Sequence, residues 1–266
     1  MAQARRRLDA ELVHRGLARS REQARALIED GRVLLANVVA TKPATQVDAT
    51  ASLKVTGAED GPDYVSRGAH KLIGALDAFG LDVAGRHALD AGASTGGFCD
   101  VLLRRGIAAV VAVDVGYGQL AWPVRSDPRV TVLERTNVRD LTAEMLPFAP
   151  DLVVGDLSFI SLRLVLPPLA AVATPDADLA LMVKPQFEVG KDLVGAGGVV
   201  RDPALRSDAV RRIAVAAWDL GLGTAGVVAS PLPGPSGNVE YFLHLRRGAE
   251  PLDDVDLARA IEEGPQ

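Results

Sequence analysis

The chain has 266 residues, of which 24% are charged and 48% are hydrophobic, as is typical of a soluble globular protein with a sizeable core. No apolar run approaches the roughly 20 residues that cross a bilayer, and the basic start lacks the apolar segment of a secretory signal. The single cysteine, Cys99, cannot form an internal disulfide, and the four histidines show no metal-ligand spacing. We therefore expect a cytoplasmic protein without a metal site.

The net charge of −5 hides an uneven distribution along the chain. Residues 1–72 carry twelve Lys and Arg against nine Asp and Glu, whereas the remaining residues carry 17 against 25. A basic front on an acidic body favours contact with a polyanion, although a solvated arginine-rich surface has the same charge.

The front of the chain predicts two short helices followed by short strands. Leu8 and Leu12 have helical spacing, and Ser20 with Gln23 forms a capping box that opens a second helix. Gly31 is placed to end that helix. The stretch GRVLLANVVATKP then alternates and carries turn signals, which predicts strands joined by a turn. These elements make a small α+β domain over residues 1–62.

The stretch RRLDAELVHRGLARSREQARALIEDGRVLLAN resembles the S4 RNA-binding domain. In that family the second helix and the loop after it face structured RNA. The resemblance implies that basic residues of this part contact phosphates, as duplex RNA is read mostly through shape and backbone. The predicted RNA contacts are Arg5, Arg6, Arg19, Arg21, Arg25, Lys42 and Arg67.

After a Gly-, Pro- and acid-rich boundary, with a linker at 63–66, apolar runs alternate with helical patterns. The predicted buried strands are 87–92, 108–115, 130–134, 151–157, 179–184, 224–230 and 240–245. Helices are expected near 98–106, 161–173 and 203–220, as well as around Lys71. This alternation predicts a Rossmann-like, seven-stranded α/β sheet over residues 67–248, followed by a C-terminal tail at 249–266.

The stretch ALDAGASTGGFCDVLL predicts a strand, a glycine-rich turn and a helix, which is where open α/β sheets bind ligands. Asp114 ends the next strand, where a carboxylate can accept hydrogen bonds from ribose hydroxyls, and Asn137 after the third strand can meet an adenine edge. The predicted cofactor-binding residues are Asp90, Gly92, Ala93, Ser94, Gly96, Gly97, Phe98, Asp114, Asn137, Val138 and Asp156.

A dinucleotide and S-adenosylmethionine would both suit such a turn. The spacing D-x-G-x-x-x-G-G lacks the G-x-G-x-x-G of dinucleotide sites and the Walker lysine of triphosphate sites. The pattern at the end of the chain also predicts a hairpin-like pair of strands, as in the methyltransferase variant of this sheet. We therefore expect S-adenosylmethionine.

Four charged residues lie where the predicted sheet presents its active edge. Lys71 begins a helix, Asp156 follows one strand, Lys184 ends another before Pro185, and Glu240 opens the last. Buried lysines are costly unless they are paired, and Asp156 and Glu240 are available as partners. Two structural salt bridges, Lys71–Glu240 and Lys184–Asp156, are the simpler interpretation of this set.

The four positions resemble the Lys-Asp-Lys-Glu tetrad of FtsJ-like RNA ribose 2′-O-methyltransferases, in the contexts SRxxxKL and VKPQFE. The tandem of S4 and methyltransferase domains is similar to the TlyA group, also named hemolysin A, over roughly residues 5–247. The resemblance implies methyl transfer to a cytidine ribose of ribosomal RNA, in both 16S and 23S RNA or in 23S RNA alone, with ribosomal RNA or subunits as partners. It leaves the oligomeric state open.

The chemistry explains why such residues are needed. A ribose 2′-hydroxyl is a poor nucleophile, and a lysine beside it can stabilise the developing alkoxide or take the proton. We assign this role to Lys184, oriented by Asp156, with Lys71 and Glu240 holding the ribose. The alternatives are a non-catalytic ribosome assembly factor and a membrane-lytic hemolysin, although the sequence has no amphipathic lytic segment.

Overall fold

The computed structural model describes residues 5–18, 20–36, 38–48, 50–55, 64–234 and 236–265. The chain divides into two compact units, Met1–Asp63 and Tyr64–Gln266. The division falls within the stretch that the sequence predicts to be a linker.

The first unit contains two helices and two small sheets. Helices α1 (Leu8–His14) and α2 (Arg21–Glu29) pack together, and strand β1 (Arg6–Arg7) pairs with β4 (Gln46–Val47). A three-stranded sheet has the order β3 (Val38–Val39), β2 (Val33–Leu35), β5 (Leu53–Val55). The Ser20 hydroxyl accepts a hydrogen bond from the Gln23 amide, so the predicted start of α2 is confirmed.

The second unit contains one seven-stranded sheet, in the order β11-β12-β10-β9-β6-β7-β8. Strand β12 runs antiparallel to both of its neighbours, β10 and β11, whereas the other neighbouring strands of this sheet pair in parallel. The fold class predicted from the sequence is confirmed. The strand bounds are β6 (His87–Ala91), β7 (Ala109–Val113), β8 (Val130–Leu133), β9 (Leu152–Gly155), β10 (Asp178–Val183), β11 (Leu222–Ala229) and β12 (Tyr241–Arg247).

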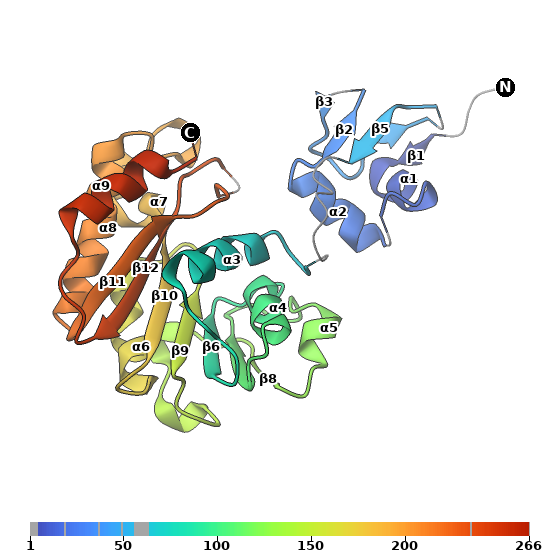
Figure 1. The fold of residues 1–266 in the computed structure, drawn as a ribbon. Coiled ribbons are helices and arrows are strands. Elements are labelled where there is room, and N and C mark those ends of the chain that lie inside the picture. The colour runs from blue at the N-terminus through green and yellow to red at the C-terminus, as the bar shows by residue number, and fades with distance from the viewer. Residues whose placement is uncertain are drawn as a thin grey trace. The chain divides into compact units, whose positions relative to one another are not determined.

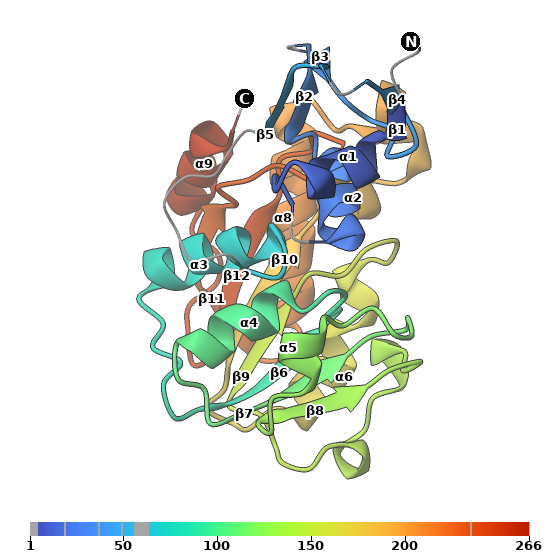
Figure 2. The same cartoon turned by 90° about the vertical axis from the view of Figure 1, so that its right-hand side faces the viewer.

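Helices cover both faces of this sheet (Figures 1 and 2). One face is covered by α3 (Gly68–Phe79), α4 (Gly97–Arg104) and α5 (Trp122–Arg125), and the other by α6 (Leu166–Val172), α8 (Pro203–Trp218) and α9 (Asp254–Glu263). The short helix α7 (Pro185–Glu188) directly follows β10. The 3₁₀ turns are η1 (Val138–Asp140), η2 (Ala143–Met145), η3 (Leu162–Leu164), η4 (Lys191–Leu193) and η5 (Ala196–Gly198).

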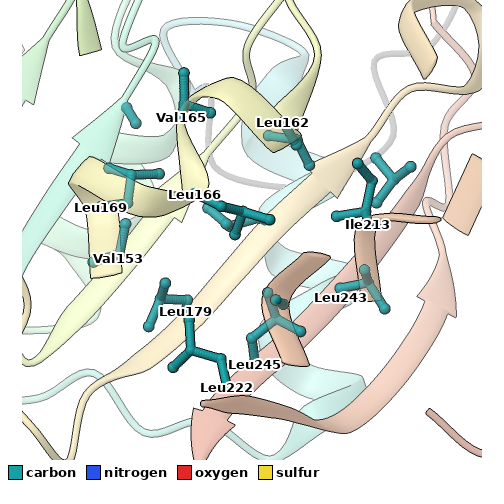
Figure 3. Close-up of a cluster of buried hydrophobic side chains, with 14 of the residues drawn as sticks. Val153, Leu162, Val165, Leu166, Leu169, Leu179, Ile213, Leu222, Leu243 and Leu245 are labelled. Atoms are coloured by element: carbon teal, nitrogen blue, oxygen red, sulfur yellow. The ribbon is translucent and has the colours of Figure 1, made fainter. Parts of the chain in front are cut away.

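Alternation along the strands divides the core into two layers. In β10, Leu179, Leu181 and Val183 pack with α6, α8 and α9, whereas Ala180 and Met182 pack with α3 and α4. Figure 3 shows the first of these layers, in which side chains from the sheet, α6 and α8 gather. The same alternation decides which way the residues just beyond the strand ends point.

Two predictions about elements need correction. The expected tail at 249–266 contains α9, whose Leu257, Ala260 and Ile261 are buried in the core of the second unit, so these residues belong to the domain. The single helix expected at 161–173 is divided into η3 and α6. Pro167 and Pro168 lie in the first turn of α6, because a residue without an amide hydrogen is tolerated there and not inside a helix.

Within the described residues, no helix combines the length and apolar character needed to cross a membrane.

Candidate active site

A cavity of about 700 Å³ opens beside the carboxyl ends of the parallel strands. From β6 the chain moves through β7 and β8 to one side, whereas β9 and β10 lie on the other. Strands of open α/β sheets leave a crevice where the strand order reverses in this way. The cavity lies beside this reversal, because Gly92 after β6 and Asp156 after β9 both line it.

The glycine turn after β6 brings two strand ends close together. Gly92 has a φ of 86°, and a Cβ at this position would lie 2.9 Å from the carbonyl oxygen of Asp156. A side chain at position 92 would therefore be strained and would push the two strand ends apart. The turn also exposes Ser94, which lines the cavity.

Two polar groups face the cavity from the next strands. The Asp114 carboxylate accepts hydrogen bonds from the backbone amides of Ser94 (2.8 Å) and Gly116 (2.6 Å). The Asn137 side-chain oxygen accepts from the Arg139 amide at 3.1 Å and caps η1. Both residues line the cavity together with Val138, so the structure brings six of the predicted cofactor residues to one place: Gly92, Ser94, Asp114, Asn137, Val138 and Asp156.

The other predicted cofactor residues support the turn and do not line this cavity. Gly97 closely approaches Ser66 and the amide of Ala69, and Phe98 is buried against Phe242. Ala93 lines a small adjoining hollow. Gly96 is the N-cap of α4 and adopts the left-handed conformation. That these four residues help to bind the cofactor, by giving the turn its shape, stays a prediction.

Asp90 is fully buried behind the turn. One carboxylate oxygen accepts hydrogen bonds from the amide and the thiol of Cys99, both at 3.1 Å. The other oxygen has no partner among the described residues. Burial raises the pKa of Asp90 to about 7, and the Cys99 hydrogen bond opposes this only in part.

Two lysine–carboxylate pairs, in which both lysines are buried, lie at the same edge of the sheet. The Nζ of Lys184 lies 2.5 Å from Asp156 Oδ1 and donates to the Ser158 hydroxyl at 2.8 Å. The Nζ of Lys71 donates to Glu240 Oε2 at 2.5 Å. Lys71 and Lys184 are only 6% and 7% exposed. Lysines are rarely buried this deeply unless they are paired, and both of these are.

Strand register explains why the two pairs meet. Val183 lies opposite Tyr241 in the antiparallel β10–β12 ladder, so the next residues outward, Lys184 and Glu240, are neighbours. By alternation both point to the face covered by α3, and Lys71 lies in the first turn of α3. Asp156 follows β9, the parallel neighbour of β10. Four residues from distant parts of the chain thus converge on one place.

Glu240 retains an unused acceptor at this site. Its Oε1 is buried without a partner among the described residues, while Oε2 accepts from Lys71. A Cβ at Gly234 would lie 2.6 Å from Oε1, so the absence of a side chain there makes room for the carboxylate. An unpaired buried acceptor is costly, and a donor on a bound molecule would remove that cost.

Sequence reasoning missed the segment that connects Asp156 to η3. Leu157, Ser158, Phe159, Ile160 and Ser161 all line the cavity. Phe159 is 92% exposed and has a φ of 63°. Ser158 was the signal in the sequence that could have pointed to this segment. It lies two residues after Asp156, at the end of a strand, and its hydroxyl contacts Lys184 at the end of the neighbouring strand.

The predicted RNA contacts fall on both units. Arg6, Arg21 and Arg25 are about half exposed, and each pairs with a buried carboxylate, Glu11 for Arg6 and Asp9 for the other two. Arg5 and Lys42 are exposed. Arg67 precedes α3 in the second unit, where it donates to the Pro233 carbonyl. Arg19 lies outside the described residues. Their contact with RNA stays a prediction.

A seven-stranded sheet in which β12 is antiparallel, with a cavity at the glycine turn, is typical of a methyltransferase domain. Comparisons with known families agree. Residues 64–247 match the FtsJ-like methyltransferases, and residues 6–52 match the S4 domain.

Similar proteins show to which family of FtsJ-like methyltransferases the chain belongs. The 16S/23S rRNA (cytidine-2′-O)-methyltransferase TlyA of Mycobacterium tuberculosis is 61% identical, over 97% of this chain and 98% of that protein. Hemolysin A of Brachyspira hyodysenteriae is 35% identical, over 90% and 99%. A solved structure from Streptococcus thermophilus, named as a hemolysin, superposes with a TM-score of 0.77 at 36% identity, covering 98% of this chain and 96% of its own. The chain belongs to the TlyA family of FtsJ-like methyltransferases.

Proposed function

We propose that the protein transfers a methyl group from S-adenosylmethionine to the ribose 2′-hydroxyl of a cytidine in 16S ribosomal RNA, 23S ribosomal RNA or both. The observation that carries this proposal is the presence of two buried lysines at the strand edge, each paired with a carboxylate, one of which, Asp156, also lines the cavity. A fold needs no such cluster for stability, since apolar residues of similar volume serve as well or better.

The residues around the cavity suit S-adenosylmethionine. Asp114 presents a carboxylate that can accept from ribose hydroxyls, and Asn137 and Val138 offer polar and apolar contacts for an adenine. The volume of about 700 Å³ lies in the usual range for a ligand of this size. When bound, this cofactor supplies a methyl group that its positive sulfur has already activated.

The protein then has to place and activate the acceptor oxygen. Lys184 Nζ is held between Asp156 and Ser158, so its position is fixed before an RNA arrives. Its ammonium form stabilises the developing alkoxide, and its neutral form can take the hydroxyl proton. Lys71 and Glu240 hold the ribose. In-line placement of the oxygen and the methyl carbon supplies most of the acceleration.

The S4-type unit supplies the contact with RNA in this proposal. Half-exposed and exposed cations on it, Arg5, Arg6, Arg21, Arg25 and Lys42, are suited to phosphates. Ribosomal RNA or a ribosomal subunit is therefore the proposed partner, and the cytoplasm the proposed location.

Two measurements test the function. Mapping of 2′-O-methylation on ribosomes from cells with and without the protein should reveal a cytidine that is methylated only in its presence. Calorimetric titration with S-adenosylmethionine should give saturable binding at one site. Binding without any lost methylation would favour an assembly factor that kept the fold, and absence of both would reject the proposal.

A further inference from the structure

The segment from Asp156 to Ser161 is held at both ends by one neighbouring turn. At its start, Asp156 and Ser158 contact Lys184. At its end, Ser161 donates from its hydroxyl to Glu188 Oε2 at 2.5 Å, and the Leu162 amide donates to Glu188 Oε1 at 2.9 Å. Lys184 and Glu188 lie four residues apart, as the N-cap and the last residue of α7.

The rest of the segment has mainly apolar contacts: Leu157 and Ile160 pack against the core, and the Phe159 ring lies 5.3 Å from that of Phe187 in α7. Ser158 and Phe159 are exposed, and the left-handed conformation of Phe159 is unfavourable for a residue with a Cβ. The segment nevertheless forms one wall of the cavity. A strained wall with exposed side chains must be stabilised by its anchors.

The Glu188 anchor is built as a partly buried polar contact. Both carboxylate oxygens are used, and Ser161 Oγ in turn accepts from the Arg163 amide at 3.2 Å, so η3 begins on this cluster. Burial raises the pKa of Glu188, and the hydrogen bonds from Ser161 and Leu162 oppose that effect. Because burial of the Glu188 carboxyl group is costly, we infer that its two hydrogen bonds to Ser161 and Leu162 have a role in the protein.

We propose that Glu188 is a positioning residue for methyl transfer, because it clamps the 156–161 wall to α7 and thereby holds Asp156 and Ser158 against Lys184. This inference rests on the proposed function for its effect on rate. Its effect on the affinity for S-adenosylmethionine can be measured without methyl transfer to RNA, since the clamped wall lines the cavity.

Three variants of the full-length protein test the clamp. Glu188→Ala removes both hydrogen bonds. Glu188→Gln keeps the shape and one acceptor, and its amide can still donate to Ser161. Asp253→Ala is the matched control, because its carboxylate also caps a helix, accepting from the amides of Val255 and Asp256 at the start of α9.

We expect Glu188→Ala to lower kcat by about tenfold to a hundredfold, since small misplacement of reacting groups has effects of that size. Calorimetry should show S-adenosylmethionine bound about fivefold more weakly, as expected for loss of a hydrogen-bonded anchor. Glu188→Gln should restore most of both values. Asp253→Ala should lose comparable stability in urea and leave kcat and affinity near those of the unchanged protein.

Unchanged kcat and affinity in Glu188→Ala would overturn the clamp, as would equal losses in Asp253→Ala. If Glu188→Ala does not fold, Ser161→Ala removes only one arm, and an unchanged affinity in that variant has the same meaning. If the unchanged protein methylates no ribosomal RNA, the proposed function fails, while the affinities for S-adenosylmethionine still decide whether the clamp exists.

Discussion

Two fully buried aspartates, one in each unit, are held in opposite ways. Asp9 in α1 is contacted by the guanidinium groups of Arg7, Arg21 and Arg25. Asp90 at the end of β6 has only Cys99 and no cation among its described contacts. The hydrogen bond from Arg7 leads the effects that hold the pKa of Asp9 well below its usual range, whereas burial raises the pKa of Asp90 to about 7.

The charged groups of the first unit and those at the strand edge of the second unit also differ in which partner is buried. In the first unit the carboxylates are buried and their arginines reach water, so a guanidinium can hold Asp9 and still face a polyanion. At the strand edge of the second unit the lysines are buried as well, and each is committed to one carboxylate. Lys184 and Asp156 therefore form a third environment, in which a buried ammonium is held by one partly exposed carboxylate. The following variants test this comparison.

Lys184→Ala should have the largest effect. Removing the ammonium leaves the acceptor oxygen without stabilisation, and we expect a rate loss of about a thousandfold or more. Binding of S-adenosylmethionine should persist, because Lys184 does not line the cavity. A tritiated-methyl assay on ribosomal substrate and calorimetry check the two expectations, and full activity would reject the assignment of Lys184.

Asp9→Ala should destabilise the first unit by about 2–3 kcal/mol, since three arginines lose their shared partner although each can be solvated. Hydrogen exchange over α1 and α2 measures this loss. S-adenosylmethionine affinity serves as the control and should not change. Because the pKa of Asp9 is lowered on folding, its contribution is present above the unfolded value near 4 and disappears only as pH falls through the folded value. Unaltered exchange would show that the cluster is not structural.

Asp90→Asn should change the pH dependence of stability. The folded state keeps the Asp90 proton up to about pH 7, whereas the unfolded chain releases it near pH 4. Stability from this group therefore falls as pH rises between these values, by about 1.4 kcal/mol per pH unit. Urea unfolding at pH 5 and pH 7 should show this decrease in the unchanged protein and its absence in the variant. Identical slopes would show that Asp90 is ionised when folded.

Arg25→Ala should have the smallest effect, a loss of RNA affinity below about tenfold, with the salt dependence of binding less steep by about one counterion. Arg212→Ala is the control, because Arg212 lies on α8 and pairs with Asp208. Filter binding to ribosomal RNA over a range of salt concentrations measures both. Equal losses in the two variants would show that the first unit has no special phosphate contact at this position.

Local patterns in the sequence determined much of this protein. Apolar runs that alternate with helical patterns predicted all seven strands of the large sheet. Polar residues at the strand ends predicted Asp114, Asn137 and Asp156, which line the cavity, and Lys184, which pairs with Asp156. Strands and the polar residues at their ends can be predicted from the sequence because a buried strand ends where its apolar run ends. The capping box at Ser20 likewise depends on residues three apart.

Tertiary structure decided how these residues are brought to one place. The sequence already suggested the pairs Lys71–Glu240 and Lys184–Asp156, and the structure contains both. Only the order of strands and the antiparallel β12 set Lys184 beside Glu240. The three arginines on Asp9, the clamp of Glu188 on Ser161 and the burial of α9 were not foreseen. Each depends on side chains brought together by packing, and no local pattern records the position of a distant partner.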